Sequence, residues 1–414
     1  MSNRFRAGFR NSIAMYAGIA YSQVISFLGI IYISRALGVE NYGIYTSVCA
    51  YISLFGIILL NGLNKVFARE ASRTPEDVEI WFRRSLAFRE SLIICALLLA
   101  VSLSFVIPYE NAVRIYIIIY STKLIFDGYS SIIFRIYQAT EQHKYIAIVN
   151  SVNKTLFVGL SVAALSLGGG IIWLFAVFVV SGVISLVLNL LIINRLGEFR
   201  SFPKPTLHFS RIKPVFVFSA IQMLSFLALR IDLLMISYLS TPEQVGIYAV
   251  ASKMVRQGLL IRRAISMAFF PTFVKKLEES KVRSISLIKY GILILSALTI
   301  LVIPFAVYSK EIIATVFGME YIRSHIILRI LIFYVPIWAA TLPITLAAQA
   351  TGNERVLLIG YIVMSILNLS LNYLLFHLLG LMGIAISTLV VFSSGGAIMT
   401  LLCIRKMKAQ GRIV

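Results

Sequence analysis

Long apolar runs dominate the chain and constrain its fold more than any other feature. A helix needs about 20 apolar residues to cross the hydrocarbon core of a bilayer, and most of the 414 residues fall into runs of that length. Hydrophobic residues make up 59% of the chain, whereas a soluble domain is about 45–50% apolar. The sequence therefore predicts an all-α integral membrane protein.

We place twelve membrane spans by run length and by the polar segments between runs. A basic N-terminus precedes the first run, which is longer than the roughly 7–15 residues of a secretory signal, so we interpret it as a retained span. Prolines inside the ninth and tenth runs predict kinked or broken helices there. The spans are 11–34, 42–64, 85–107, 112–137, 145–167, 171–195, 214–238, 246–270, 286–308, 324–350, 355–378 and 381–404.

The basic residues predict the orientation. The net charge is +21, from 38 Lys+Arg against 17 Asp+Glu. With a cytoplasmic N-terminus, most basic residues outside the spans fall in cytoplasmic segments, where membrane proteins concentrate them. This asymmetry predicts that both termini are cytoplasmic, and it explains most of the charge without a nucleic-acid partner. The outside loops hold only Arg35, Arg114, Lys310 and Arg323.

Two short phrases occur twice. ENYGIY at 40–45 returns as EQVGIY at 243–248, and QATEQHK at 138–144 returns as QATGNER at 349–355. We interpret the first pair as turns made by glycine and the second as helix ends whose side chains satisfy terminal carbonyls. The chain is then a six-helix unit used twice, with parallel halves because six is even. We expect an N-terminal bundle at 1–195, a cytoplasmic linker at 196–213 and a C-terminal bundle at 214–414.

A further set of basic residues lies inside the spans, where a central charge costs at least about 2.5–3.5 kcal/mol. Those near cytoplasmic ends are expected to reach the headgroups, namely Arg89, Arg135, Arg262 and Lys289. Lys253, Arg256 and Arg263 share one side of the span at 246–270, and Arg262 points the opposite way. We therefore expect Arg262→Ala to be nearly silent beside Arg256→Ala.

Lys123, Lys154 and Arg230 are also deep within their spans. Asp127 lies four residues after Lys123, so the two can pair, whereas Asp232 lies two residues after Arg230 and needs another partner. Bases outnumber acids within the spans, so we expect the basic side chains to line a water-filled cavity between the two bundles. The matching cargo is anionic and bears phosphate. The alternative is a set of internal salt bridges.

Nothing in the sequence predicts catalytic or metal-ligating residues. The three cysteines lie in apolar runs without metal or disulfide spacing, and the four histidines are scattered. No glycine-rich phosphate loop is present. We therefore expect a protein that is not an enzyme, and a membrane glycosyltransferase or polymerase is the less favoured alternative.

The first span ends in SRALGVENYGIYT, and LNGLNKVFARE follows the second. With the tandem halves, these segments resemble the polysaccharide-transport branch of the multidrug/oligosaccharidyl-lipid/polysaccharide (MOP) superfamily. The motif from Arg35 to Gly43 is most similar to that of bacterial O-antigen repeat-unit flippases. The resemblance implies a MATE-like fold, with two bundles in a V shape around a central cationic cavity and alternating access, in the bacterial inner membrane.

The same resemblance implies a cargo and partners. The cargo is undecaprenyl-pyrophosphate-linked oligosaccharide of lipopolysaccharide biosynthesis, flipped from the cytoplasmic to the periplasmic leaflet. It implies no cofactor, with antiport against a proton or sodium gradient as the drive. Membrane lipids, and the polymerase and chain-length regulator of the same pathway, are the other partners. A lipid II flippase and a multidrug extruder of the same fold are the alternatives.

The resemblance also suggests roles for residues by their position. By this resemblance, the candidates for phosphate binding are the basic residues Lys123, Lys154, Arg230, Lys253, Arg256 and Arg263. The acids inside spans, Asp127 and Asp232, are the ion-coupling candidates. The candidates for contact with the sugar are Tyr120, Asn150, Asn153 and Gln257.

Overall fold

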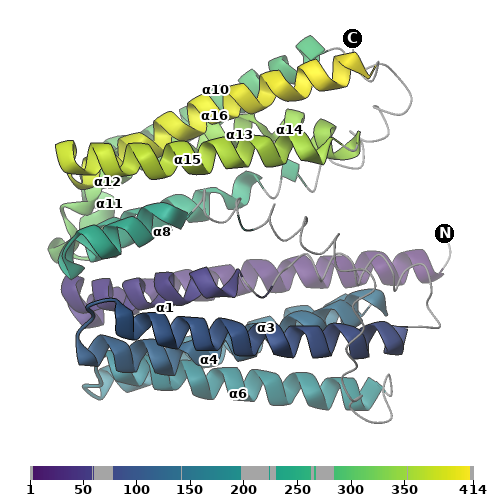
Figure 1. The fold of residues 1–414 in the computed structure, drawn as a ribbon, viewed down its shortest axis with the longest axis vertical. Helices are drawn as coiled ribbons and strands as arrows, with labels where there is room; N and C mark the ends of the chain where they lie inside the picture. Colours follow the sequence, from purple (N-terminus) through teal and green to yellow (C-terminus); the bar gives the residue numbers. More distant parts are fainter. Residues whose placement is uncertain are drawn as a thin grey trace. The chain divides into compact units, whose positions relative to one another are not determined.

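The computed structural model describes residues 3–57, 59, 78–140, 142–196, 223, 230–262, 265–266, 284–351 and 353–410. Within these ranges every regular element is helical (Figure 1), which confirms the all-α prediction. Contacts divide the chain into two compact units, Met1–Met223 and Leu224–Val414. The predicted linker at 196–213 lies outside the described residues apart from Leu196.

The N-terminal unit is a bundle of long helices that lie nearly side by side (Figure 1). Helix α1 packs on α5, α3 packs on α4, and both α4 and α5 pack on α6. Such helices are long enough to cross a bilayer. Their bounds are α1 Asn3–Gly56, α3 Val78–Val106, α4 Asn111–Ala139, α5 His143–Ser166 and α6 Ile171–Leu196.

Helix α1 joins the first two predicted spans across a break at Gly38. Gly38 has φ 73° and ψ 173°, a backbone conformation that glycine adopts without the steric cost of a Cβ. We predicted that Gly43 makes this turn, which is wrong, because Gly43 is helical and buried. The repeated glycine of the first phrase therefore belongs to helix packing, and the turn lies five residues before it.

The C-terminal unit contains shorter and more interrupted helices. Helix α15 packs on α16, α12 packs on α8 and α16, and α13 packs on α10 and α16. Residues 230–239 are also helical. The bounds are α8 Pro242–Gly258, α10 Ser284–Val307, α11 Ser309–Val316, α12 Ser324–Leu331, α13 Tyr334–Ala340, α14 Leu342–Ala350, α15 Glu354–Leu379 and α16 Leu381–Ala409.

The predicted span at 324–350 is broken, as its prolines indicated. It consists of α12, α13 and α14, and Pro343 lies in the first turn of α14, where a proline is tolerated. Helix α10 behaves differently, because it continues through Pro304 and ends at Val307. The segment at 309–323, which we predicted as an outside loop, contains α11 and a short 3₁₀ turn at Met319–Tyr321.

The second repeated phrase forms the same cap in both units. The hydroxyls of Thr140 and Thr351 donate to the carbonyls of Ile136 and Ala347, at 3.0 and 2.8 Å. The backbone N–H groups of the same two threonines donate to the same carbonyls. The interpretation of Gln-Ala-Thr as a helix end whose side chains satisfy terminal carbonyls is confirmed.

Nine helices in the described ranges are long and apolar enough to cross a membrane. The chain is therefore a multi-pass membrane protein. The count of twelve stays a prediction, because the predicted spans at 42–64, 214–238 and 246–270 all run into residues outside those ranges. The cytoplasmic position of the termini also stays a prediction.

Candidate functional site

A polar cavity of about 370 Å³ lies within the N-terminal unit. It is bounded by α3, α4, α5 and α6 and by the end of α1 at Gly56. Three basic side chains and one carboxylate line it, together with amides and hydroxyls. Ionisable groups within membrane-spanning helices face the bundle interior or water rather than lipid. The polar lining residues are Arg89, Lys123, Asp127, Ser130, Ser131, Asn150, Asn153, Lys154 and Ser185.

Lys123 and Asp127 form an ion pair on α4, which confirms the pairing predicted from their spacing. The Asp127 side chain is 51% exposed and that of Lys123 is 26% exposed. Lys154 projects from the middle of α5, is exposed to the cavity, and interacts electrostatically with both members of the pair. One carboxylate thus stands among several cations, so the cavity keeps a net positive charge.

Arg89 is the basic side chain of the cavity that sequence reasoning placed wrongly. We expected it to reach the headgroups, but it is 1% exposed, lines the cavity and donates to the carbonyl of Leu59. Leu59 follows the end of α1, where carbonyls lack helical partners. Helix α3 begins at Val78, earlier than predicted, so Arg89 lies about three turns into it rather than near its end.

The sugar-contact candidates of this unit do not all lie at the cavity. Asn150 and Asn153 line the cavity, and the Asn153 amide donates to the Ser181 carbonyl at 3.3 Å. Tyr120 is 7% exposed and packs against Phe175 and Phe178, with ring centroids 5.3 and 4.7 Å away. Tyr120 therefore belongs to an aromatic core, and its contact with a sugar remains only a prediction.

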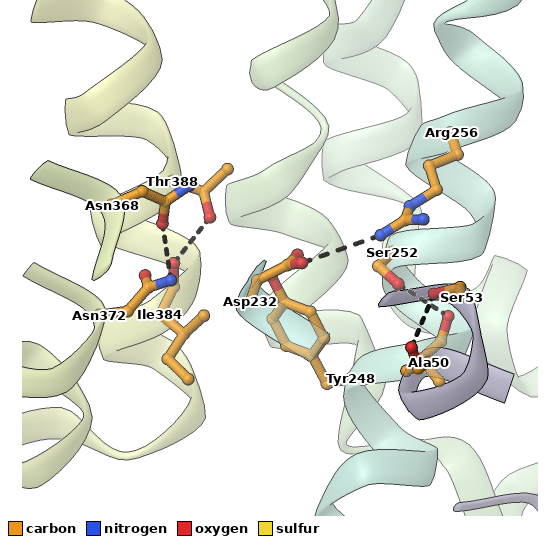
Figure 2. Close-up of polar contacts among 11 residues, drawn as sticks. Ala50, Ser53, Asp232, Tyr248, Ser252, Arg256, Asn368, Asn372, Ile384 and Thr388 are labelled. Atoms are coloured by element: carbon orange, nitrogen blue, oxygen red, sulfur yellow. Dashed lines mark hydrogen bonds and ion pairs between the residues drawn. The ribbon is translucent and has the colours of Figure 1, made fainter. Parts of the chain in front are cut away.

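In the C-terminal unit a carboxylate is buried in a polar cluster (Figure 2). Asp232 is 8% exposed, and the hydroxyl of the fully buried Tyr248 donates to its Oδ2 at 2.7 Å. Arg256 Nη2 lies 3.8 Å from Asp232 Oδ1. The prediction that Asp232 needs a partner other than Arg230 is confirmed, and the partners come from α8.

Two asparagines of α15 continue this cluster toward α16 (Figure 2). The Asn372 amide donates to Asn368 Oδ1 at 2.6 Å, and both residues are nearly fully buried. Thr388 of α16 interacts with the Tyr248 hydroxyl and donates to the Ile384 carbonyl at 3.0 Å. Sequence reasoning missed both asparagines, although two amides one turn apart in an apolar helix are a signal of a buried polar contact.

The oxygen atoms of the cluster are incompletely satisfied. Asp232 Oδ1 and Asn372 Oδ1 are buried and accept no hydrogen bond from the part of the chain that the structure describes. Buried polar atoms normally find a partner, so each of these oxygens is still able to accept a hydrogen bond or to contact a cation. No group of three His, Cys, Asp or Glu side chains within the described ranges is suited to a metal ion.

The remaining site candidates lie on or near α8. Lys253 and Gln257 are half-buried on α8, and Arg230 is exposed at the start of the helical segment 230–239. Arg263 lies outside the described residues. The structure therefore brings Arg256 to Asp232, as described above, and leaves the binding roles of the other candidates as predictions.

Arg262 does not reach toward a headgroup, contrary to our expectation. Its guanidinium stacks on the Trp338 ring, with Cζ 4.3 Å from the ring centroid, and its Nη2 donates to the Thr345 hydroxyl at 3.3 Å. Trp338 and Thr345 belong to α13 and α14, so the contact depends on the broken span. We expected Arg262→Ala to be nearly silent because Arg262 points away from the side of Arg256, and these contacts show that Arg262 is packed against Trp338 and Thr345 on its own side.

Comparison with known proteins assigns the chain to a family. A family model described as "Polysaccharide biosynthesis protein" matches residues 9–277, more than half of the chain. No curated protein sequence matches it. The solved structures that share its fold are those of a flippase and of transporters, in agreement with the expectation that the chain is not an enzyme.

Solved structures share the fold at low sequence identity. The lipid II flippase MurJ in an inward closed conformation matches with a TM-score of 0.68 and 15% identity, over 96% of this chain and 87% of MurJ. An inward-facing multidrug resistance MATE family transporter of the MOP superfamily matches with a TM-score of 0.71 and 16% identity, over 95% and 98% of the two chains.

A third similar structure is a MOP superfamily transporter from Pyrococcus furiosus described by the reverse polarity of its binding pocket. It matches with a TM-score of 0.67 and 18% identity, over 97% of this chain and 96% of the other. Likeness at such identity shows the fold, and a fold alone does not fix the substrate. The chain therefore belongs to the family of polysaccharide biosynthesis proteins, with the fold of the MOP superfamily transporters.

Proposed function

We propose that the protein flips an undecaprenyl-pyrophosphate-linked oligosaccharide of the O-antigen class from the cytoplasmic to the periplasmic leaflet of the bacterial inner membrane. The observation that carries this proposal is the cavity of the N-terminal unit. Arg89, Lys123 and Lys154 face it with Asp127 as the one carboxylate. A pyrophosphate needs cationic partners when it leaves water, and Lys and Arg are the usual phosphate ligands in proteins.

The other lining groups suit the sugar part of such a cargo. Asn150, Asn153 and three serines offer amide and hydroxyl groups beside the basic side chains. A multidrug extruder for cationic compounds would favour a predominantly acidic cavity, and this one is predominantly basic. Another lipid-linked oligosaccharide, such as lipid II, is the second candidate, because the chain shares its fold with a lipid II flippase.

We further propose that a monovalent cation, H⁺ or Na⁺, drives transport through Asp232. The alternative carboxylate, Asp127, is more exposed, with 51% of its side chain accessible, and it lines the cavity proposed for the cargo. Asp232 is buried beside the Tyr248 hydroxyl, and its Oδ1 accepts no hydrogen bond from described residues. A cation there would compete with Arg256 for the carboxylate, so ion occupancy would change the charge that α8 presents to the cargo.

Binding measurements on the purified full chain in lipid nanodiscs test the choice of cargo. We expect a pyrophosphate-linked oligosaccharide lipid to bind and a cationic dye to bind at least about tenfold more weakly, a difference of about 1.4 kcal/mol. Lys154→Gln and Lys123→Gln should weaken lipid binding, and Lys406→Gln, at the exposed end of α16, is the matched control. Preference for the dye, or equal lipid binding by all variants, would contradict the proposal.

A further inference from the structure

The surroundings of Arg262 in the C-terminal unit do not neutralise its charge. The guanidinium stacks on Trp338 and donates to the Thr345 hydroxyl. Thr345 itself donates to the Leu342 carbonyl at 2.9 Å, so it is a neutral and already engaged partner. Within the described ranges no carboxylate forms an ion pair with Arg262, and its Nε is buried without a hydrogen-bond partner.

A second unsatisfied group belongs to the same aromatic cluster, because Tyr334 and the Trp338 ring under this guanidinium both pack edge-on against Phe392. Tyr334 is 6% exposed, and its hydroxyl is buried without a hydrogen-bond partner among the described residues. Its ring is held edge-on to Phe392, with the centroids 4.5 Å apart. The phenol interacts electrostatically with Arg262, Arg256 and Asp232. The hydroxyl therefore lies in the electrostatic field of two guanidinium groups and one carboxylate, and only Arg256 is paired with that carboxylate.

These groups are complementary to an oxyanion. Arg262 offers a guanidinium N–H, and Tyr334 offers an O–H. Stacking on an aromatic ring fixes the plane of a guanidinium and leaves its N–H groups directed outward from the edge. An acceptor that took both donors would satisfy two buried groups at once, and a negative acceptor would also balance the excess of cations over Asp232.

We propose that Arg262 and Tyr334 form an anion site in the C-terminal unit that binds a phosphate group of the transported lipid. This inference rests on the proposed function, since it names a second contact for the cargo head group. Trp338 is the positioning residue, because it holds the guanidinium plane without offering a hydrogen bond to phosphate. A water molecule that bridges the two donors is the competing occupant, and the test below separates it from phosphate.

Tyr334→Phe is the sharpest variant because it removes only the unsatisfied hydroxyl. Geranyl pyrophosphate and inorganic pyrophosphate are the probes, bound to the full chain in nanodiscs and measured by calorimetry. We expect Tyr334→Phe and Arg262→Gln each to weaken binding of both probes by about tenfold, as loss of a charge-assisted hydrogen bond predicts. The double variant should be little weaker than either single variant. Tyr373→Phe, an exposed tyrosine of α15, is the matched control.

The melting temperature separates binding from structure. Phosphate binding predicts that Tyr334→Phe melts no lower than the wild type. A variant that melts lower but binds as the wild type does would overturn the inference in favour of a structural water. Loss of binding for geranyl pyrophosphate alone would place Tyr334 against the lipid tail and would also overturn it. Tighter binding of the prenyl probe than of the inorganic probe by the wild type identifies the lipid, rather than free phosphate, as the ligand.

Two further variants separate this inference from the proposed function. Lys123→Gln and Lys154→Gln alter the cavity of the N-terminal unit and leave the Arg262 site intact. If they weaken binding and Tyr334→Phe does not, the inference fails and the flippase proposal stands. If none of these variants weakens binding of either probe, both fail.

Discussion

The two units use their polar residues in different ways. In the N-terminal unit, Lys123, Asp127 and Lys154 stand around an accessible polar cavity. In the C-terminal unit, Asp232 and Asn372 are packed inside, whereas the cavity of about 510 Å³ between α10, α13, α14 and α16 is lined mostly by apolar side chains. The difference is that the N-terminal unit places its charged pair at a polar cavity, whereas the C-terminal unit buries its carboxylate among packed side chains.

The first repeated phrase shows the same divergence at equivalent positions. Tyr45 of ENYGIY packs on the Phe175 ring, with the centroids 5.5 Å apart. Tyr248 of EQVGIY donates its hydroxyl to Asp232. The duplicated sequence therefore preserved the helix and its tyrosine, and only the C-terminal copy places that tyrosine beside a charge.

Replacing Asp232 should have the largest effect of all the variants. A small effect would contradict the difference drawn between the two units. Asp232→Asn leaves Arg256 without its carboxylate, and removal of one partner of a buried ion pair costs about 3 kcal/mol. We expect lower unfolding stability and loss of the dependence of transport on an ion gradient, measured in vesicles with imposed proton or sodium gradients. Asp127→Asn is the matched control and should keep that dependence.

Asp127→Asn also tests the difference between the two units, because it should change the affinity for substrate. The change removes the one carboxylate of the polar cavity and leaves Lys123 and Lys154. We expect binding of pyrophosphate to tighten by about three- to tenfold, because an opposing charge near a surface site contributes about 1 kcal/mol. Calorimetry at two salt concentrations checks this, and the gain should shrink at high salt. Weaker binding would show that Asp127 accepts hydrogen bonds from the cargo instead.

Replacing the two tyrosines of the first repeated phrase should have smaller effects than replacing Asp232. Tyr248→Phe removes a buried hydrogen bond to a carboxylate and should cost about 1.5–3 kcal/mol of stability. Tyr45→Phe keeps the ring contact with Phe175 and should change stability by less than about 1 kcal/mol. Thermal melting in detergent compares the two directly. Equal losses would mean that Tyr248 is held by its ring rather than by Asp232.

The paired caps should behave alike and show the smallest effects. Thr140→Val and Thr351→Val each remove one hydroxyl bond to a helix-end carbonyl, which should cost about 0.5–1.5 kcal/mol. Because the two bonds are equivalent, the losses of melting temperature should agree. A large difference between them would contradict a shared origin for the two helix ends.

Local spacing predicted some of this structure correctly. The pair Lys123 and Asp127 follows from a separation of four residues on one helix. The broken span follows from Pro336 and Pro343, because proline removes a helical hydrogen bond. The repeated caps follow from Thr140 and its copy. Each of these features depends on neighbours within a few residues.

The errors share a different cause. Arg89 and Arg262 were judged by their distance from the predicted span ends, whereas their positions depend on the Leu59 carbonyl and on Trp338, which are remote in sequence. Arg256 as the partner of Asp232 depends in the same way on how α8 packs against the segment 230–239. Sequence spacing predicts contacts along one helix, and contacts between helices require the packing itself.

The most direct test of the central claim is the rate at which reconstituted vesicles flip a defined pyrophosphate-linked oligosaccharide. The account predicts that Lys154→Gln lowers this rate about tenfold or more, since a charge-assisted contact is lost, and that Lys123→Ala and Arg256→Ala also lower it. Lys406→Gln should flip at the rate of the wild type. Equal rates for Lys154→Gln, Lys123→Ala, Arg256→Ala and the wild type, at matched expression, would contradict the claim that these cations carry the phosphates of a lipid across the membrane.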